Sequence, residues 1–205
     1  MRLSHSILAT LAALSIATTA WAGPPTETVR QYTDQVQKIL EDSTLRQGDK
    51  LAAIRKVAVE VFDVTETAKR ALGRHWQART PAEREEFTQL FADLVERTYG
   101  QKVDRYGGEK LQYTTETVDG EFASVRAKVV TKKKTEVSVE ARLHQRSGRW
   151  LIYDILVENV SLIANYRTQF DRIIRTSSYR DLVERLRSKR DEFFNEMEVK
   201  PARAS

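Results

Sequence analysis

The 205-residue chain contains no cysteine. Disulfide bonds therefore cannot stabilise it, and chemistry that depends on a thiolate is excluded. After its first two dozen residues, the chain also lacks any apolar run near the roughly 20 residues that a membrane-spanning helix needs. We therefore expect the fold to be stabilised by the burial of apolar side chains.

Residues suited to catalysis or metal binding are also scarce. There are three histidines, His5, His75 and His144, and no two of them have the spacing of metal ligands. The sequence has no glycine-rich phosphate loop and no nucleophile elbow. Ser161 has no base near it in sequence and is expected to be the N-cap of the following helix. The sequence therefore predicts no metal site, no cofactor and no enzyme.

Residues 1–22 have the pattern of a secretory signal peptide. Arg2 supplies the positive start, an apolar stretch runs from Ile7 to Ala17, and Ala20-Trp21-Ala22 has the Ala-x-Ala form of a cleavage site. A membrane anchor is the alternative, but the apolar stretch is shorter than a span requires. We therefore expect export to the periplasm and a mature protein that begins near Gly23.

The chain is basic, with a formal net charge of +5. In an exported protein this charge favours anionic lipid headgroups or acidic protein surfaces over nucleic acid, and a solvated surface without a specific partner is the alternative. The same choice applies to a basic run on the outward face of two predicted strands and their connecting loop. That run either discourages pairing at the sheet edge or docks an acidic partner or lipid phosphate. It comprises Arg126, Lys128, Lys132, Lys133, Lys134 and Arg142.

Hydrophobic periodicity predicts helices at both ends of the chain and strands between them. Helical spacing covers 26–40, 51–62, 64–72, 81–106, 161–175 and a last helix from 178. Period-two alternation covers 111–115, 123–129, 137–144 and 150–157, with turn signals at Asp119-Gly120 and Ser147-Gly148. The pattern predicts an α+β fold over residues 23–198, a four-stranded antiparallel sheet packed by N- and C-terminal helices. A disordered tail is predicted for 199–205.

Asp154 lies inside the apolar strand that begins at Trp150. An unpaired carboxylate would be costly to bury there. Asp154 is therefore either a general base in a cavity or a structural residue, and the structural role is favoured. In that role it pairs with Arg142, Arg149 or Arg167, or it caps a neighbouring loop.

Several separated pieces of the sequence form an ordered set. They are Phe62-Asp63-Val64, Ala71-Leu72-Gly73-Arg74-His75-Trp76, Thr80 with Arg84, Phe87, Phe91 and Tyr99, then Gly148-Arg149-Trp150, Asp154, residues 157–162, and Asn165-Tyr166-Arg167 with Phe170. Taken in this order, they resemble the MlaC family of periplasmic phospholipid-binding proteins, also called the toluene-tolerance family. The resemblance spans about residues 26–190, and hopanoid-associated relatives share the same pattern. Asn159 departs from the glycine expected there, although asparagine tolerates left-handed backbone.

The resemblance implies a mixed, NTF2-like fold around an apolar pocket for phospholipid acyl chains, with no cofactor and no catalysis. It implies a monomeric carrier that maintains outer-membrane lipid asymmetry. The implied partners are an outer-membrane lipoprotein–porin complex and an inner-membrane ABC transporter with an MCE-domain subunit. The alternatives are a closed-core module that docks a membrane transport complex, and a relative specific for hopanoids or another lipid.

We predict a pocket lining of aromatic and aliphatic residues, and for each of them a place in a closed core is the alternative. The predicted lining is Trp76, Phe87, Leu90, Phe91, Leu94, Tyr99, Val125, Val139, Leu143, Ile152, Ile155, Tyr166 and Phe170.

Overall fold

The computed structural model describes residues 24–100, 109, 111–130 and 135–188. The predicted signal peptide, the predicted tail and Lys132–Lys134 lie outside these residues. The helices are α1 (Pro24–Glu41), α2 (Gln47–Val61), α3 (Val64–Leu72), the 3-10 helix η1 (Gly73–His75), α4 (Pro81–Gly100), α5 (Leu162–Thr176) and α6 (Tyr179–Arg187). The strands are β1 (Leu111–Asp119), β2 (Phe122–Val130), β3 (Glu136–Arg146), β4 (Arg149–Val157) and β5 (Val160–Ser161).

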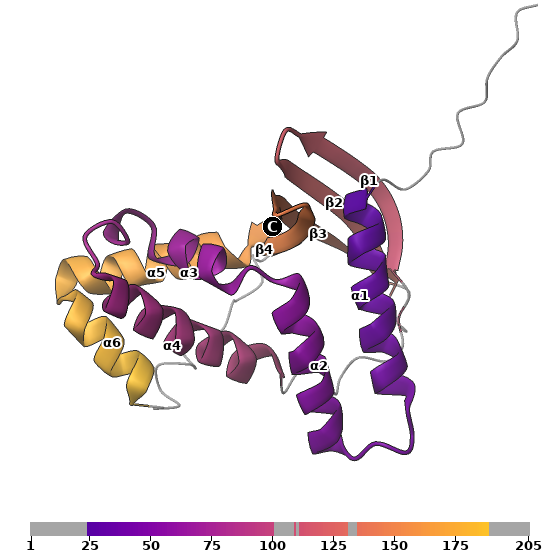
Figure 1. Ribbon diagram of the computed structural model, residues 1–205, viewed down its shortest axis with the longest axis horizontal. Coiled ribbons are helices and arrows are strands. Elements are labelled where there is room, and N and C mark those ends of the chain that lie inside the picture. The colour runs from indigo at the N-terminus through magenta and orange to yellow at the C-terminus, as the bar shows by residue number, and fades with distance from the viewer. Residues whose placement is uncertain (1–23, 101–108, 110, 131–134, 189–205) are drawn as a thin grey trace, which may run out of the picture.

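The described strands form one antiparallel sheet in the order β1-β2-β3-β4-β5, which confirms the α+β class and the meander (Figure 1). The predicted turns are also confirmed, because Gly120, Ser147 and Gly148 have the positive φ angles that tight hairpins need. The sheet has one more strand than predicted. Glu158 and Asn159 both have positive φ, at 50° and 62°, and turn the chain back to pair β5 with β4. A two-residue strand has no alternation for sequence reasoning to detect.

The starts of α3, α4 and α5 follow from side-chain caps. Thr80 and Glu83 form a capping box at α4, in which the Glu83 N–H donates to Thr80 Oγ1 and the Thr80 N–H donates to Glu83 Oε2. Asp63 caps α3, and Ser161 caps α5 by accepting from the Ala164 N–H at 2.9 Å. These caps satisfy backbone donors that would otherwise lack partners.

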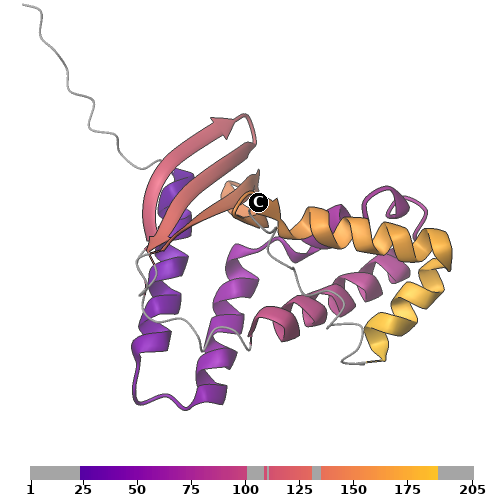
Figure 2. The ribbon, with the colours of Figure 1, turned by 180° about the vertical axis from the view of Figure 1, so that it is seen from behind.

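Two apolar clusters divide the protein into a helical half and a sheet half. Figures 1 and 2 show α3, α4, α5 and α6 together on one side, and the sheet with α1 and α2 on the other. The helical cluster comprises large side chains from α3 to α6, and the sheet cluster comprises mainly small ones from α1, α2 and the strands. This difference in side-chain size is central to the candidate site.

Asp63 connects the junction of α2 and α3 to the sheet. Its N–H donates to the Ile152 carbonyl at 2.9 Å, and its Oδ1 accepts from the Glu66 N–H at 2.9 Å. Its Oδ2 accepts from Arg146 Nη1 at 2.9 Å and lies 3.1 Å from His144 Nε2. Asp63 is buried, so these bonds hold the junction in a site with little access to water.

In the part of the chain that the structure describes, no helix is both long and apolar enough to cross a bilayer.

Candidate functional site

A cavity of about 1190 Å³ lies between the sheet and the α1–α2 pair. The inner faces of β1 to β4 form one wall, α1 and α2 form the other, and Tyr99 of α4 closes part of one side. The apolar lining is Val29, Tyr32, Val36, Leu40, Ile54, Val57, Ala58, Val61, Phe62, Leu111, Tyr113, Val125, Ala127, Val129, Val139, Ala141, Ile152 and Ile155.

The cavity exists because the side chains on its sheet wall are short. β2 presents Val125, Ala127 and Val129 to it, and β3 presents Val139 and Ala141. Val125 and Ala141 pack in one cluster with Val29 and Val61, but farther along the sheet these short side chains leave space in front of α1 and α2. Protein interiors normally pack without such voids, and an unfilled apolar cavity of this size would be destabilising. The cavity therefore has the size and lining of a ligand site.

A polar stripe of α1 also lines the cavity. Arg30, Thr33, Asp34 and Gln37 fall on one side of the helix at spacings of three, four and seven residues. We call these four residues the α1 rim. Thr33 Oγ1 lies 2.7 Å from the Tyr113 hydroxyl, which places the rim beside β1. Because Asp34 both lines the cavity and is exposed, the cavity reaches solvent along this flank of α1.

The structure places five of the thirteen predicted lining residues in the cavity wall: Tyr99, Val125, Val139, Ile152 and Ile155. Leu143 belongs to the sheet cluster and is fully buried. The other seven, Trp76, Phe87, Leu90, Phe91, Leu94, Tyr166 and Phe170, belong to the helical cluster or pack against it. Their role in lipid binding stays a prediction. The candidate site is the wall of the cavity.

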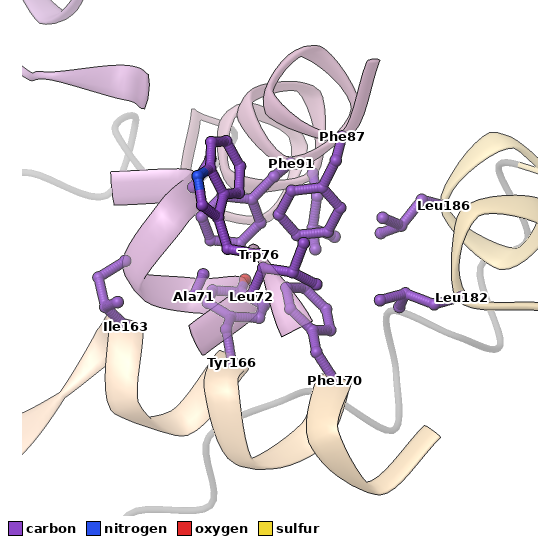
Figure 3. Close-up of a cluster of buried hydrophobic side chains, with 12 residues drawn as sticks. Ala71, Leu72, Trp76, Phe87, Phe91, Ile163, Tyr166, Phe170, Leu182 and Leu186 are labelled. Atoms are coloured by element: carbon purple, nitrogen blue, oxygen red, sulfur yellow. The ribbon is translucent and has the colours of Figure 1, made fainter. Parts of the chain in front are cut away.

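The helical cluster is a closed aromatic core (Figure 3). The ring centroids of Phe87 and Phe170 lie 5.7 Å apart edge to face, and those of Phe91 and Tyr166 lie 5.1 Å apart in the same way. Such pairs stabilise a core beyond their area burial. Phe87, Phe91 and Phe170 are 0–1% exposed, so protein atoms enclose these rings, and none of them lines the cavity.

The cavity residues that sequence reasoning missed lie mainly on α1 and α2, and the strands add Leu111, Tyr113, Ala127, Val129 and Ala141. Val29, Tyr32, Val36, Leu40 and Ile54 were predicted to form helix faces but not to line a pocket. What shows that these residues line a cavity is that they face short alanine and valine side chains on the strands. This can be recognised only when the opposing elements are known.

Asp154 has the favoured structural role. It is buried on the sheet face opposite the cavity, since Ile155 and Ile152 line the cavity and Asp154 pairs with Arg142 across the strands. Its carboxylate accepts from Ser161 Oγ at 2.6 Å and from the Ile163 N–H at 3.1 Å. Arg142 Nη1 lies 4.0 Å away. Asp154 thus fixes the first turn of α5.

Replacing Asp154 with alanine is expected to lower the free energy of unfolding by about 2 kcal/mol, because a buried N–H and a hydroxyl lose their acceptor. Asp154→Asn, which keeps one acceptor oxygen, should lose less. Urea unfolding of the three proteins would measure both values. Equal stability of wild type and Asp154→Ala would contradict this structural role.

The basic run on the outer sheet face is largely neutralised in its described part. Glu140 is buried and accepts from Arg126 at 2.6 Å and from Arg142 at 3.1 Å, and Lys128 pairs with Glu136 at 2.7 Å. These pairs agree with edge protection. Docking through Lys132, Lys133 and Lys134 concerns residues outside the described part of the chain.

Stability is expected to fall steeply as the pH drops below about 4. Burial acts to raise the pKa of Glu140 and of Asp63, but hydrogen bonds and neighbouring charges outweigh it and hold both pKa values below their ordinary range. For Glu140 these groups are Arg126 and Arg142; for Asp63 they are the Glu66 N–H, Arg146 and His144.

A carboxylate whose pKa is lower in the folded state stabilises the fold fully above its unfolded pKa. That contribution is lost as the pH falls through the folded value. Urea unfolding midpoints between pH 7 and pH 2 would measure the effect. Glu140→Gln should make the fall in stability at acid pH, the acid limb of this curve, shallower. An acid limb of unchanged slope in that variant would contradict the assignment to Glu140.

The family model described as MlaC protein matches residues 30–188. A curated relative, the intermembrane phospholipid transport system binding protein MlaC of Haemophilus influenzae, is 23% identical over 115 residues, covering 54% of this chain and 54% of the relative. The chain therefore spans about half the length of this curated relative.

Two solved structures match this chain to different degrees. The phospholipid-binding protein from Ralstonia solanacearum, solved in complex with a phospholipid, has a TM-score of 0.73 and 22% identity, covering 85% of this chain and 99% of that one. A putative NTF2-like transpeptidase from Campylobacter jejuni has a TM-score of 0.33 and 16% identity, covering 63% of this chain and 97% of that one. The first of these likenesses supports the fold.

Proposed function

Because this chain belongs to the MlaC protein family, we propose that it binds phospholipid acyl chains in the cavity between α1, α2 and the sheet. The observation that carries the proposal is an unfilled apolar cavity of about 1190 Å³ beside a separate, closed core. The predicted lining residues Val125, Val139, Ile152 and Ile155 form the sheet side of this proposed site.

The dimensions of the cavity suit acyl chains. Its α1 wall runs from Val29 to Leu40, which corresponds to roughly 16 Å along a helix. An acyl chain of about 15 methylene groups costs on the order of 12 kcal/mol to expose to water, at ~0.8 kcal/mol for each group. A carrier must therefore enclose the chains, yet it must hold them weakly enough to release them to a membrane. Small, flexible apolar walls meet both needs.

We further propose that the protein works in the periplasm as a monomeric carrier that takes part in maintaining outer-membrane lipid asymmetry. In this proposal it exchanges phospholipid with an outer-membrane lipoprotein–porin complex and with an inner-membrane ABC transporter that has an MCE-domain subunit. The proposed chemistry is transfer without bond breaking, so neither a cofactor nor a catalytic group is required.

The test is a lipid extract of the protein purified from a bacterial host without detergent. Mass spectrometry of the extract is expected to find phospholipid in near-stoichiometric amount. Protein that is folded but carries no lipid, and takes none from vesicles, would overturn the proposal. In that case salt-sensitive binding to a membrane complex would favour the alternative of an interaction module.

A further inference from the structure

The α1 rim carries charges of both signs where the cavity meets solvent. Arg30 and Asp34 both line the cavity, and they lie one helical turn apart. Glu27, one turn before Arg30, adds a second carboxylate, but its side chain is 64% exposed and its Oε2 lies 3.8 Å from Arg30 Nη1. Arg30 is therefore only weakly neutralised by its own helix.

Arg30 is held in place by an aromatic ring. Its guanidinium lies over the Tyr113 ring, 5.1 Å from the centroid. The hydroxyl of the same ring is 2.7 Å from Thr33 Oγ1, which ties β1 to α1. Cation–π contact and this hydrogen bond together orient the guanidinium at the cavity edge. An oriented arginine with open donors suits a phosphate group.

The negative charge of the α1 rim comes from the Asp34 carboxylate. Asp34 is exposed and has no ion-pair partner among the residues that the structure describes. The charges of Asp34, Arg30 and Glu27 all act on the Tyr113 phenol, whose pKa is raised mainly by burial, so these groups share one small region. A carboxylate there would repel an anionic headgroup and attract an ammonium group.

We infer that the α1 rim binds the headgroup of a zwitterionic phospholipid, with Arg30 at the phosphate and Asp34 at the ammonium group. The inference rests on the proposed function, since it supposes that acyl chains occupy the cavity. Side chains at positions i and i+4 of a helix are about 5–6 Å apart at Cβ. A phosphate and an amine joined by a two-carbon linker can span such a gap. The rim thus favours an amine headgroup over an uncharged polyol headgroup on the same phosphate.

The test uses the full-length mature protein and vesicles of equal parts phosphatidylethanolamine and phosphatidylglycerol. After exchange, the bound lipids are extracted and quantified by mass spectrometry. Wild type is expected to bind phosphatidylethanolamine in three- to fivefold excess over phosphatidylglycerol, which corresponds to the free energy of about one partly exposed ion pair. Asp34→Asn should abolish that preference. Arg30→Gln should reduce the uptake of both lipids without changing their ratio.

The matched controls are Arg46→Gln and Asp49→Asn. These residues form a similar pair on the exposed start of α2, with Arg46 Nε 2.9 Å from Asp49 Oδ2, and neither lines the cavity. Both controls should behave as wild type. Bound lipid with no headgroup preference, or a preference unchanged by Asp34→Asn, would overturn this inference and leave the proposed function standing. No bound lipid in wild type would overturn both.

Discussion

Replacing Val139 with tryptophan is expected to weaken the affinity for phospholipid about 50-fold, and so to lower its occupancy, while the protein stays folded. Val139 lies on β3, is half-buried and faces the cavity. An indole there would displace on the order of three methylene groups of the ligand. At ~0.8 kcal/mol for each group, the loss is about 2.4 kcal/mol, which corresponds to that change in affinity. Occupancy is measured as phospholipid per protein in a detergent-free lipid extract.

The control is Ser138→Trp, which adds the same ring to the neighbouring residue on the opposite face of β3. Ser138 contributes only its backbone to the contacts with Glu158, so its side chain is free to change. This variant should keep full occupancy. Val125→Trp is a weaker test, because Val125 is 2% exposed and a larger side chain there would also overpack the sheet cluster. Full occupancy in folded Val139→Trp would contradict the proposed site.

Replacing Asp63 with alanine is expected to cost about 3 kcal/mol of unfolding free energy, or roughly 6–12 °C in Tm. The change removes the cap of α3 and leaves the buried side of His144 without its carboxylate partner. It also removes the bond from Arg146 that holds the end of β3 to the α2–α3 junction. Thermal and urea unfolding would measure the loss.

Asp171→Ala is the matched comparison, since Asp171, like Asp63, contacts a histidine and arginine, although with two arginines instead of one. Asp171 Oδ1 lies 2.8 Å from His75 Nε2 and 2.6 Å from Arg74 Nη2, and Arg175 is 3.9 Å from its Oδ2. Asp171 is much less buried than Asp63, so water replaces its partners at little cost. The loss of unfolding free energy in Asp171→Ala should therefore be much smaller than in Asp63→Ala. Equal losses of unfolding free energy at the two sites would show that burial does not determine how much Asp63 contributes to stability.

The sequence predicts most elements of this fold because they carry local signals. Thr80 with Glu83, Asp63 and Ser161 have the side chains that cap helices, and Asp119-Gly120 has the pattern of a hairpin turn. β5 has no such signal. Its turn needs positive φ at Glu158 as well as Asn159, and glutamate rarely adopts that conformation.

The candidate site is less predictable, because a buried face does not reveal whether the space in front of it is filled. Phe91 and Val125 have equally regular spacing, yet the first packs in a closed core and the second faces the cavity. The outcome depends on the volumes of the side chains that oppose them across elements distant in sequence. For Asp154 the sequence identified Arg142 among three candidates, but the nearer partners are Ser161 Oγ and the Ile163 N–H.

The separation of the two apolar clusters bears on how such a protein can change during evolution. The buried aromatic side chains of the helical cluster make no part of the cavity wall, which only Tyr99, at the edge of that cluster, reaches among the aromatic residues packed there. Ala127 lies on that wall and outside the sheet cluster, so each added methylene there would subtract volume from the cavity instead of straining a filled core. Selection could therefore adjust the size of the accepted cargo in small steps at this alanine. The residues that keep the chain folded need not change with them.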